Sequence, residues 1–471
     1  MASGTFFRYT HNAMQYNHIF QYRLPDFTDV HGGEYLLVWG ELAQWLMVDQ
    51  DVPKFLAYFD GRRTLGEVIA LFAQETQAPP AAVEQDVFPM MEELLRRGIL
   101  HSPGAPPLEN ADELKIANVT MNLTNRCNLR CRWCYNSNRV TEELPIEVLM
   151  DAIAAGKSVY SPDASFILLG GEPFIDPPRL VASLERARDI FTAPTLVSTN
   201  GTLLSGDMIQ KLACYPIEIQ VSVDGGRRET HERVRGPETF DRTIENVRRL
   251  TASGIYTILS MVYVKDSEPE LEPFFDLALE LGVQEARLIP LRAIGRGLDF
   301  SDNLPRQDRI FEALMSLLGR RPEIARLLGR DFFSILATVC SQSQRRLHCG
   351  VGRNVVFIDS DGALYPCPNH VGPEYRCGHI PEDTIEGVLL SSPVMCAMRK
   401  RYCVALYKRC RKCAFRHWCA GDCRGETVSL SGNPHAPSRH CGELQKIIPS
   451  MLWMIARGTL PLPMSRRPIQ I

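Results

Sequence analysis

The sequence predicts an α/β protein built on a parallel sheet, open or curled into a partial barrel, with a small α+β domain before it and a cysteine-rich domain after it. Six alternations of strand-like and helix-like segments between residues 116 and 291 indicate the parallel sheet. A cysteine-free stretch with a short hairpin pattern and helical patterns precedes them. Of the 15 cysteines, three fall at 127, 131 and 134, and eleven lie between 340 and 441. This clustering separates the two flanking domains from the sheet.

The composition is that of a globular protein of roughly three domains, with 471 residues, 45% hydrophobic and 23% charged. Lys+Arg 52 against Asp+Glu 55 gives a net charge of −3, which excludes an overall basic field for nucleic acid or an anionic membrane. We find no apolar run of about 18 residues and no secretory signal pattern. We therefore expect a cytoplasmic protein, in which closely spaced cysteines bind metals or clusters more often than they form disulfides.

The stretch to residue 108 is expected to hold a hairpin followed by helices. Two apolar runs at 35–39 and 44–48 have strand length and are joined by a link containing Gly40. Helical patterns follow at 54–59, 64–74 and 81–97, and Thr64 with Glu67 forms a capping box at the start of the second.

The string FLAYFDGRRTLGEVIALFAQ…EQDVFPMMEELLRRGIL resembles the winged-helix-like peptide-recognition domains typified by the peptide chaperone of pyrroloquinoline-quinone biosynthesis. The resemblance implies binding of the leader of a ribosomally made precursor peptide, added as a strand to an exposed sheet edge. A structural cap without a ligand is the alternative. No Lys/Arg cluster marks a DNA-recognition helix.

A Pro-rich linker, HSPGAPPLEN, leads into the alternating region. Strands are expected at 116–123, 166–169, 195–198, 218–223, 256–264 and 286–291, and helices at 146–159, 179–191, 240–252 and 273–281. In such folds the chemistry lies at the carboxyl ends of the strands.

The first of these strands is followed by TNRCNLRCRWCYN, in which Cys127, Cys131 and Cys134 have C-x3-C-x2-C spacing. Three thiolates on one loop can reach a single iron–sulfur cubane and leave one iron for a ligand that is not protein. A zinc site lacking its fourth ligand is the alternative.

This region, about 114–300, resembles the radical S-adenosylmethionine (SAM) enzymes. Trp133 occupies the aromatic position that lies beside the adenine in that family. Further family motifs follow the next strands, and the resemblance implies that their residues contact SAM: Gly170, Gly171, Glu172, Pro173, Ser198, Asn200, Ser222, Asp224 and Arg235. Arg235 stands where relatives bind the methionine carboxylate. The resemblance implies a partial (β/α)6 TIM-like barrel in which a reduced cluster cleaves SAM to a 5′-deoxyadenosyl radical that abstracts hydrogen from substrate.

The C-terminal cysteines fall in two halves, Cys349 to Cys367 and the series C-x2-C-x5-C-x3-C-x17-C from Cys410 to Cys441. Seven cysteines exceed one tetrahedral zinc site. The pattern resembles the SPASM extension of radical SAM enzymes, an iron–sulfur domain with two auxiliary [4Fe–4S] clusters. The resemblance assigns Cys349, Cys367 and Cys423 to the first cluster and four further cysteines to the second: Cys410, Cys413, Cys419 and Cys441.

The fourth ligand of the first auxiliary cluster is left open by the sequence. Cys340 lies nine residues before Cys349 and is a candidate. If it does not ligate, an open iron could bind a substrate thiolate. Cys377, Cys396 and Cys403 have no family counterpart, and Cys214 is expected to be a core thiol.

The sequence thus predicts a peptide-recognition domain at 1–108, a radical SAM barrel at 112–330, a SPASM domain at 340–445 and a C-terminal helix and tail at 446–471. The combination implies a peptide maturase with three [4Fe–4S] clusters and SAM, fed by a reductant such as flavodoxin or ferredoxin. Thioether cross-linking is the leading chemistry. Carbon–carbon cross-linking, epimerisation and maturation of an enzyme subunit of the quinohemoprotein amine dehydrogenase type are the alternatives. Sulfatase maturation is disfavoured because Pro368, not Asp, follows Cys367.

Overall fold

The computed structural model describes residues 15–106, 114–136, 142–329 and 345–459. The chain forms two compact units. The first contains residues 1–111 together with two short segments from far along the chain, 341–346 and 412–418, and the second contains the remainder. The domain boundaries expected from the sequence stay predictions, and the first unit takes in a piece of the cysteine-rich region.

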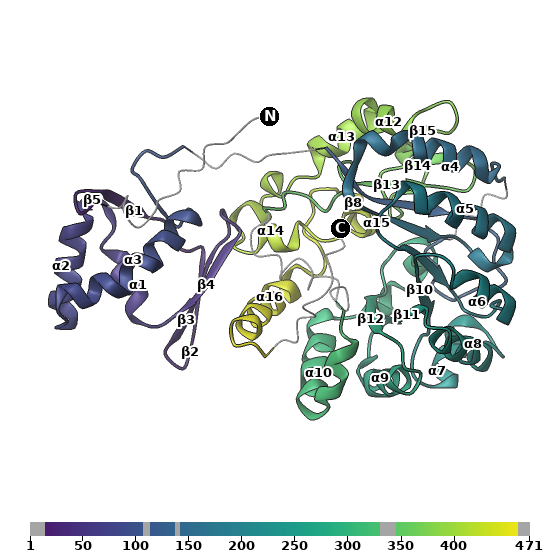
Figure 1. Ribbon diagram of the computed structural model, residues 1–471, viewed down its shortest axis with the longest axis horizontal. Helices are drawn as coiled ribbons and strands as arrows, with labels where there is room; N and C mark the ends of the chain where they lie inside the picture. Colours follow the sequence, from purple (N-terminus) through teal and green to yellow (C-terminus); the bar gives the residue numbers. More distant parts are fainter. Residues whose placement is uncertain (1–14, 107–113, 137–141, 330–344, 460–471) are drawn as a thin grey trace. The chain divides into compact units, whose positions relative to one another are not determined.

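The first unit has two small antiparallel sheets, and its residues 15–106 form three α-helices (Figure 1). Its strand orders are β5-β1-β6 and β2-β3-β4. The elements are β1 (Ile19–Tyr22), β2 (Phe27–His31), β3 (Glu34–Trp39), β4 (Gln44–Val48), α1 (Asp51–Ala57), β5 (Asp60–Thr64), α2 (Leu65–Thr76), α3 (Pro80–Arg96) and β6 (Leu100–His101).

Both local predictions for this unit are confirmed. β3 and β4 form the expected hairpin, with Tyr35 opposite Val48. The capping box is present: Glu67 N donates to Thr64 Oγ1 at 3.3 Å, and Thr64 N donates to Glu67 Oε2 at 2.8 Å. The apolar faces of α2 and α3 pack with Trp39 and Phe55 in one core.

The segment 412–418 is held to this unit at the β3–β4 turn. Glu41 forms ion pairs with Arg345, at 3.1 Å, and with Arg416. Gly40 lies so close that a Cβ there would be 2.5 Å from the carbonyl oxygen of Ala414. Cys413 therefore lies in a segment that belongs to the N-terminal unit.

The second unit is organised by a nine-stranded sheet of order β12-β11-β10-β9-β8-β7-β13-β14-β15. Its first six strands are parallel and confirm the predicted barrel sheet. They are β7 (Ile116–Asn122), β8 (Tyr160–Leu169), β9 (Thr195–Thr199), β10 (Ile217–Ser222), β11 (Tyr256–Tyr263) and β12 (Glu285–Pro290).

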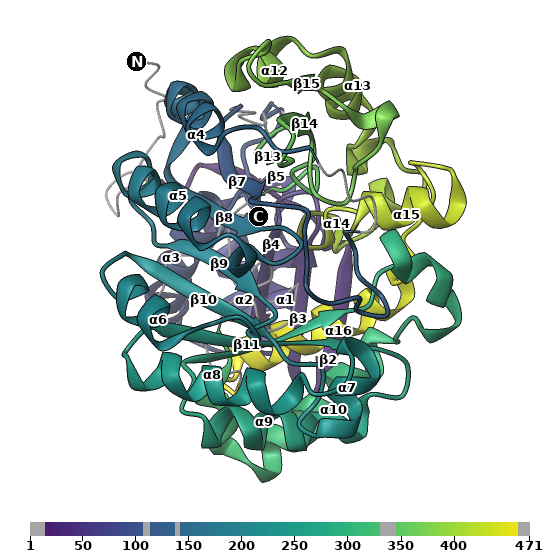
Figure 2. The same cartoon turned by 90° about the vertical axis from the view of Figure 1, so that its right-hand side faces the viewer.

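Helices cover the outer face of this sheet, as Figure 2 shows for α4, α5, α6, α8 and α9. Apolar side chains at helical spacing, such as Leu149, Met150 and Ile153 of α4, are buried against the strands. The helices are α4 (Ile146–Ala155), α5 (Pro177–Ile190), α6 (Gly206–Leu212), α7 (Arg228–Arg235), α8 (Phe240–Ala252), α9 (Leu271–Glu280) and α10 (Gln307–Arg320).

The cysteine-rich region continues the barrel sheet. β13 (Val355–Ile358) pairs in parallel with β7, placing Val355 opposite Asn118, and the antiparallel strands β14 (Ala363–Tyr365) and β15 (Gly378–His379) follow. The later helices are α12 (Ile385–Ser391), α13 (Pro393–Arg401), α14 (Arg416–Cys419), α15 (Arg424–Ser431) and α16 (Cys441–Ala456).

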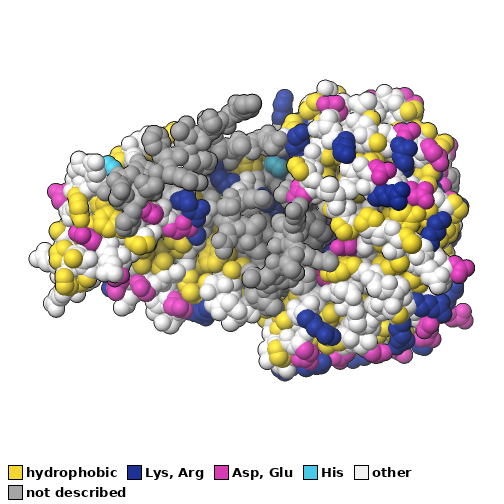
Figure 3. Space-filling model, in the orientation of Figure 1, with side chains coloured by type: hydrophobic (Ala, Val, Ile, Leu, Met, Phe, Trp, Pro, Cys, Tyr) yellow, Lys and Arg dark blue, Asp and Glu magenta, His cyan; other side chains and the backbone are white. Residues whose placement is uncertain are grey.

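On the face shown in Figure 3, basic and acidic side chains are interspersed over the second unit and form no large patch of one sign. This agrees with the near-zero net charge. Among the residues that the structure describes, no helix has the length and apolar character needed to cross a membrane.

Candidate active site

The three cysteines after β7 share one cavity. Cys127, Cys131 and Cys134 line a hollow of about 400 Å³ at the carboxyl ends of the parallel strands, where the sequence places the chemistry. Within the loop, Leu129 N lies 3.4 Å from Cys127 Sγ, and Cys134 Sγ lies 3.5 Å from Asn136 O. Three thiols converging on one cavity fit the donor set of an iron–sulfur cluster.

Gly170 and Gly171, directly after β8, let the cysteine loop lie against the sheet. Gly171 N donates to Thr124 O at 2.7 Å. A Cβ on Gly170 would clash with the carbonyl of Thr124, and one on Gly171 with that of Arg126. Gly170 also has a φ of 146°, which disfavours other residues. Both glycines line the cavity and, in addition, they position the loop.

Glu172 is fully buried and links the ends of two strands. Its Oε1 accepts from Thr199 Oγ1 at 2.7 Å, and its Oε2 accepts from Asn200 N at 2.8 Å. Burial raises the pKa of the Glu172 carboxyl, while these donors act in the opposite direction. Pro173 begins the short 3-10 helix Pro173–Ile175 and is buried. Neither side chain is among those lining the cavity; Glu172 holds the loop that carries Asn200.

The next strand ends supply polar groups to the cavity. Ser198 lies near the end of β9 and Asn200 directly after it, Ser222 ends β10 and Asp224 follows it, and all four line the hollow. Asn200 Nδ2 donates to Asn128 Oδ1 at 2.9 Å, which ties this strand end to the cysteine loop. The structure thus brings together the strand-end residues that the sequence singled out.

Arg235 and Asp224 form a buried ion pair beside the cysteines. Arg235 Nε lies 2.9 Å from Asp224 Oδ2, with 12% and 3% of the side chains exposed. Asp224 Oδ1 accepts from Val262 N at 3.0 Å, and Arg235 Nη1 lies 3.9 Å from Cys131 Sγ. Burial raises the pKa of Cys131, and the guanidinium works against that rise. Arg235 is therefore a fixed positive charge within reach of a thiolate.

Trp133 lines the cavity and packs against Phe300, with ring centroids 5.9 Å apart in a T-shaped arrangement. Its Nε1 is buried and has no hydrogen-bond partner among the described residues. An apolar wall with a donor left over suits a ligand ring that carries acceptors.

Arg292 was missed by the sequence analysis, although it follows β12 and so obeys the strand-end rule. It lines the same cavity. Its guanidinium pairs with Glu426 Oε2 at 2.7 Å and with Asp422 Oδ1 at 3.3 Å. The amide of Glu426 lies 3.4 Å from Cys423 Sγ. Two ion pairs and one backbone amide contact therefore join the barrel cavity to Cys423.

Cys349, Cys367 and Cys423 are brought close together in the second unit. Burial raises the pKa of Cys367 well above its usual value, and the neighbouring thiols of Cys423 and Cys349 raise it further. Cys367 Sγ lies 3.2 Å from His370 Nδ1, and Asn369 Nδ2 lies 3.5 Å from Cys423 Sγ. Cys367 is buried and Cys349 and Cys423 are partly buried, and a cluster bound to the three would take up the negative charge of their thiolates. Cys340 lies outside the described residues.

The other four auxiliary cysteines are divided between the units. Cys413 belongs to the N-terminal unit, and Cys410, Cys419 and Cys441 belong to the second. Their assignment to one cluster stays a prediction.

The expectation for Cys214 is wrong. It is exposed and not a core thiol. The reason is its position: α6 ends at Leu212, whose side chain is buried, and Cys214 falls in the turn that follows, where its Sγ lies 3.8 Å from Gln210 O.

Comparison with known proteins agrees with this site. Residues 121–278 match the model of the radical SAM superfamily, and residues 349–414 match that of an iron–sulfur cluster-binding domain, SPASM. The mycofactocin maturase MftC of Mycobacterium tuberculosis is 27% identical over 316 residues, which are 65% of this chain and 77% of MftC.

Two solved structures have a similar fold. The enzyme anSMEcpe with bound AdoMet gives a TM-score of 0.60 at 19% identity and covers 72% of this chain and 99% of its own. SuiB of Streptococcus suis bound to its precursor peptide SuiA gives a TM-score of 0.57 at 15% identity and covers 91% of this chain and 99% of its own. Because the part left uncovered by SuiB is smaller than the N-terminal unit, the likeness extends into that unit.

Proposed function

We propose that this chain, a radical SAM enzyme with a SPASM extension that uses [4Fe–4S] clusters and SAM, matures a ribosomally made peptide by forming a thioether cross-link. The proposed substrate class rests on MftC, a maturase, and on SuiB, solved with a precursor peptide. The proposed bond rests on the thiol-rich region beside the barrel.

One observation carries the proposal. The cavity that contains Cys127, Cys131 and Cys134 is also lined by Pro368 and Asn369, the two residues after Cys367. A substrate held in this cavity lies against the SAM region on one side and against the loop of the first auxiliary cysteines on the other. With its cluster and SAM bound, the site is supplied with a 5′-deoxyadenosyl radical.

The chain's own residues hold and enclose the reactants. We assign contacts with the SAM ribose and sulfonium to Ser198, Asn200 and Ser222, which line the cavity. Arg235 supplies a positive charge for the methionine carboxylate. Asp224 keeps that guanidinium in place through its 2.9 Å ion pair, and the amide of Val262 fixes the other oxygen of Asp224.

Trp133 supplies a flat wall for the adenine, and its Nε1, which has no partner among the described residues, offers a donor. Phe300, packed edge-on against it, supports the position of the indole ring.

The N-terminal unit is assigned to leader recognition. Its two three-stranded sheets have short edge strands, which can accept an extended peptide as an additional strand. Removing residues 1–108 would test this poorly, because the segment with Cys413 belongs to the same unit. Competition by the free leader peptide leaves the enzyme whole. An excess of leader should suppress modification of the full precursor while SAM cleavage continues.

Thioether formation is tested on the native precursor, taken from small cysteine-containing reading frames beside the gene. Closure removes two hydrogens and consumes a thiol, so the product should be two mass units lighter with one fewer alkylatable cysteine. A two-unit loss with every thiol still alkylatable would instead assign a carbon–carbon or carbon–oxygen link. An unchanged mass with solvent hydrogen incorporated would assign epimerisation.

A further inference from the structure

A second cavity of about 340 Å³ adjoins the SAM cavity. The two share four lining residues, Tyr135, Ile294, Pro368 and Asn369. It lies entirely within the second unit, between the end of the cysteine loop, β13 and α15. A substrate peptide whose reacting residue occupies the SAM cavity therefore places a neighbouring residue in this second cavity.

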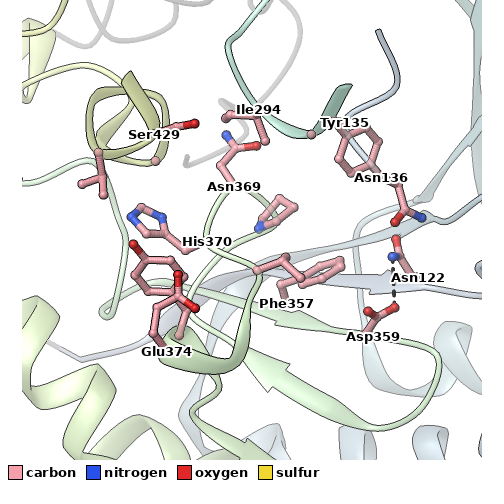
Figure 4. Close-up of a pocket in the computed structure, with 16 residues that line it drawn as sticks. Asn122, Tyr135, Asn136, Ile294, Phe357, Asp359, Asn369, His370, Glu374 and Ser429 are labelled. Atoms are coloured by element: carbon pink, nitrogen blue, oxygen red, sulfur yellow. Dashed lines mark hydrogen bonds between the residues drawn. The ribbon is translucent and has the colours of Figure 1, made fainter. Parts of the chain in front are cut away.

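The polar groups of this cavity stand on two sides. Figure 4 shows Asn136, Asn122 and Asp359 gathered on one side, and His370 and Glu374 on the other. Asp359 and Glu374 are the acidic residues of the lining, and among the described residues that line the cavity none is Lys or Arg. The described part of the lining therefore carries two carboxyl groups and no cationic side chain.

The buried carboxylate of Asp359 has one oxygen that can still accept a hydrogen bond from a ligand. The residue is 3% exposed, although a buried carboxylate is costly without a counter-charge. One oxygen, Oδ1, accepts all three recorded bonds: from Asn122 Nδ2 at 3.1 Å, from Asn125 Nδ2 at 2.8 Å and from Ser360 N at 2.8 Å. The other oxygen, Oδ2, has no hydrogen bond to any described residue.

Neighbouring groups increase the demand for a donor. Asn122 donates both its recorded bonds from Nδ2, and its Oδ1 is a buried acceptor without a partner among the described residues. Burial raises the pKa of the Asp359 carboxyl, and the Asn125 amide and Ser360 N–H oppose that rise. A bound cation would oppose that rise, since it supplies a positive charge and hydrogen-bond donors to the buried carboxylate.

We propose that this second cavity binds a cationic side chain, lysine or arginine, of a peptide residue close to the one being modified, with Asp359 as the residue that selects it. The proposal rests on the peptide-maturase function above and names the substrate feature that the enzyme requires. Asp359 accepts hydrogen bonds from Asn122, the last residue of β7, and from Asn125, two residues before Cys127. These bonds fix the position of the selecting carboxylate relative to the cysteine loop.

The experiment measures binding of two capped tripeptides, Ac-Ala-Lys-Ala-NH2 and Ac-Ala-Nle-Ala-NH2, to the anaerobically reconstituted, SAM-loaded enzyme by equilibrium dialysis. Norleucine keeps the length of the side chain and removes its charge. The lysine peptide should bind about tenfold more tightly, the ratio expected of one charge-assisted hydrogen bond. Equal binding of the two peptides to the wild-type enzyme overturns the proposal.

Asp359→Asn should bring the ratio close to one, because the amide oxygen can still accept the three bonds made to Oδ1 while the charge is gone. Asp361→Asn is the matched control: it makes the same change two residues away, at a carboxylate that accepts from Ala363 N and does not line the cavity. The control should keep the tenfold ratio. If Asp359→Asn keeps the tenfold preference for the lysine peptide over the norleucine peptide, with iron content and SAM cleavage intact, another residue selects the cation and the proposal is rejected.

Glu374→Gln is a second, milder variant in case Asp359→Asn fails to fold. Because Glu374 is exposed, the ratio should fall only about two- to threefold. Cadaverine is the competitor that separates a peptide site from a site for free amines. If cadaverine displaced the lysine peptide when both were present at the same concentration, the result would contradict a subsite for a peptide residue.

Failure of the proposed function gives a different pattern. If lysine selectivity is found and depends on Asp359, but no precursor is modified, the maturase assignment fails and the cation site stands.

Discussion

The cysteines of the barrel and those of the C-terminal region are organised in opposite ways. Cys127, Cys131 and Cys134 lie within eight residues of chain, on one loop that follows one strand. The auxiliary cysteines from Cys349 to Cys441 span more than ninety residues and fall in both compact units. A site carried by one loop needs only that loop to be held, whereas a site collected from distant segments depends on the fold around it. Substitutions should therefore act locally in the first case and at a distance in the second.

The largest effect is expected from removing the barrel cysteines. Replacing Cys127, Cys131 and Cys134 together by Ala should abolish SAM cleavage and remove about four of roughly twelve irons, as expected for one of three four-iron clusters. Iron analysis and quantification of 5′-deoxyadenosine check this. Cleavage that persists in the triple variant would show that catalysis does not depend on this loop.

Gly171→Ala tests whether the loop is held from β8. The new methyl group collides with the carbonyl of Arg126, one residue before Cys127. We expect SAM cleavage to fall by about a hundredfold or more, since a displacement on the order of 1 Å misaligns the reactants. Gly206→Ala, where no atom lies within 4 Å of the new methyl, is the control and should cleave SAM like the wild type.

Cys367→Ala should separate the two groups of cysteines. We expect loss of the first auxiliary cluster and of peptide cross-linking, with the barrel cluster and uncoupled SAM cleavage retained. Cys340→Ala should keep that cluster and some activity. Electron paramagnetic resonance of the reduced variants counts the clusters. If Cys340→Ala loses the same cluster as Cys367→Ala, Cys340 is its fourth ligand.

Arg292→Gln, a substitution in the barrel, should change the midpoint potential of the auxiliary cluster at Cys423. The substitution leaves Asp422 and Glu426 without their cation, on either side of Cys423. The added negative charge should lower the midpoint potential of that cluster by on the order of tens of millivolts. A potentiometric titration followed by electron paramagnetic resonance measures it. An unchanged potential would show that the chain of contacts has no electrostatic effect at Cys423.

The smallest effect is expected at Gly40. A methyl group there meets the backbone of Ala414 and should loosen the segment that carries Cys413. We expect slower reconstitution of the second auxiliary cluster with little change in SAM cleavage. Iron uptake followed over time, again with Gly206→Ala as control, checks this. Faster or equal uptake would show that the N-terminal unit does not support this cysteine.

The sequence predicts the local features of this structure and fails at contacts between distant segments. The barrel strands begin and end within a residue or two of their expected limits, except β8, which begins earlier, because apolar runs and helix caps are local signals. The strand-end residues also follow from a local rule, and Arg292 could have been found by it. Glu172 differs from the other motif residues. The motif predicts its position in the sequence, but it does not predict that its side chain connects two strand ends and does not line the cavity.

Contacts between distant segments could not be predicted in this way. Glu41 pairs with Arg416 across 375 residues, and Asn122 meets Asp359 across 237. Neither pair has a spacing or periodicity that one sequence can reveal. The exposure of Cys214 depends on which side of α6 faces the sheet, and the turn after that helix carries no such signal.

The pairing of β13 with β7 bears on how this protein could be shortened. All seven residues of β7 are buried, and β13 covers its outer hydrogen-bonding edge. A chain cut before residue 345 would leave β7 with a row of unsatisfied amide and carbonyl groups on a strand that has almost no charge to repel a second copy. Such a fragment should associate edge to edge and precipitate. The C-terminal region therefore also protects the barrel from aggregation, a role independent of any cluster it binds.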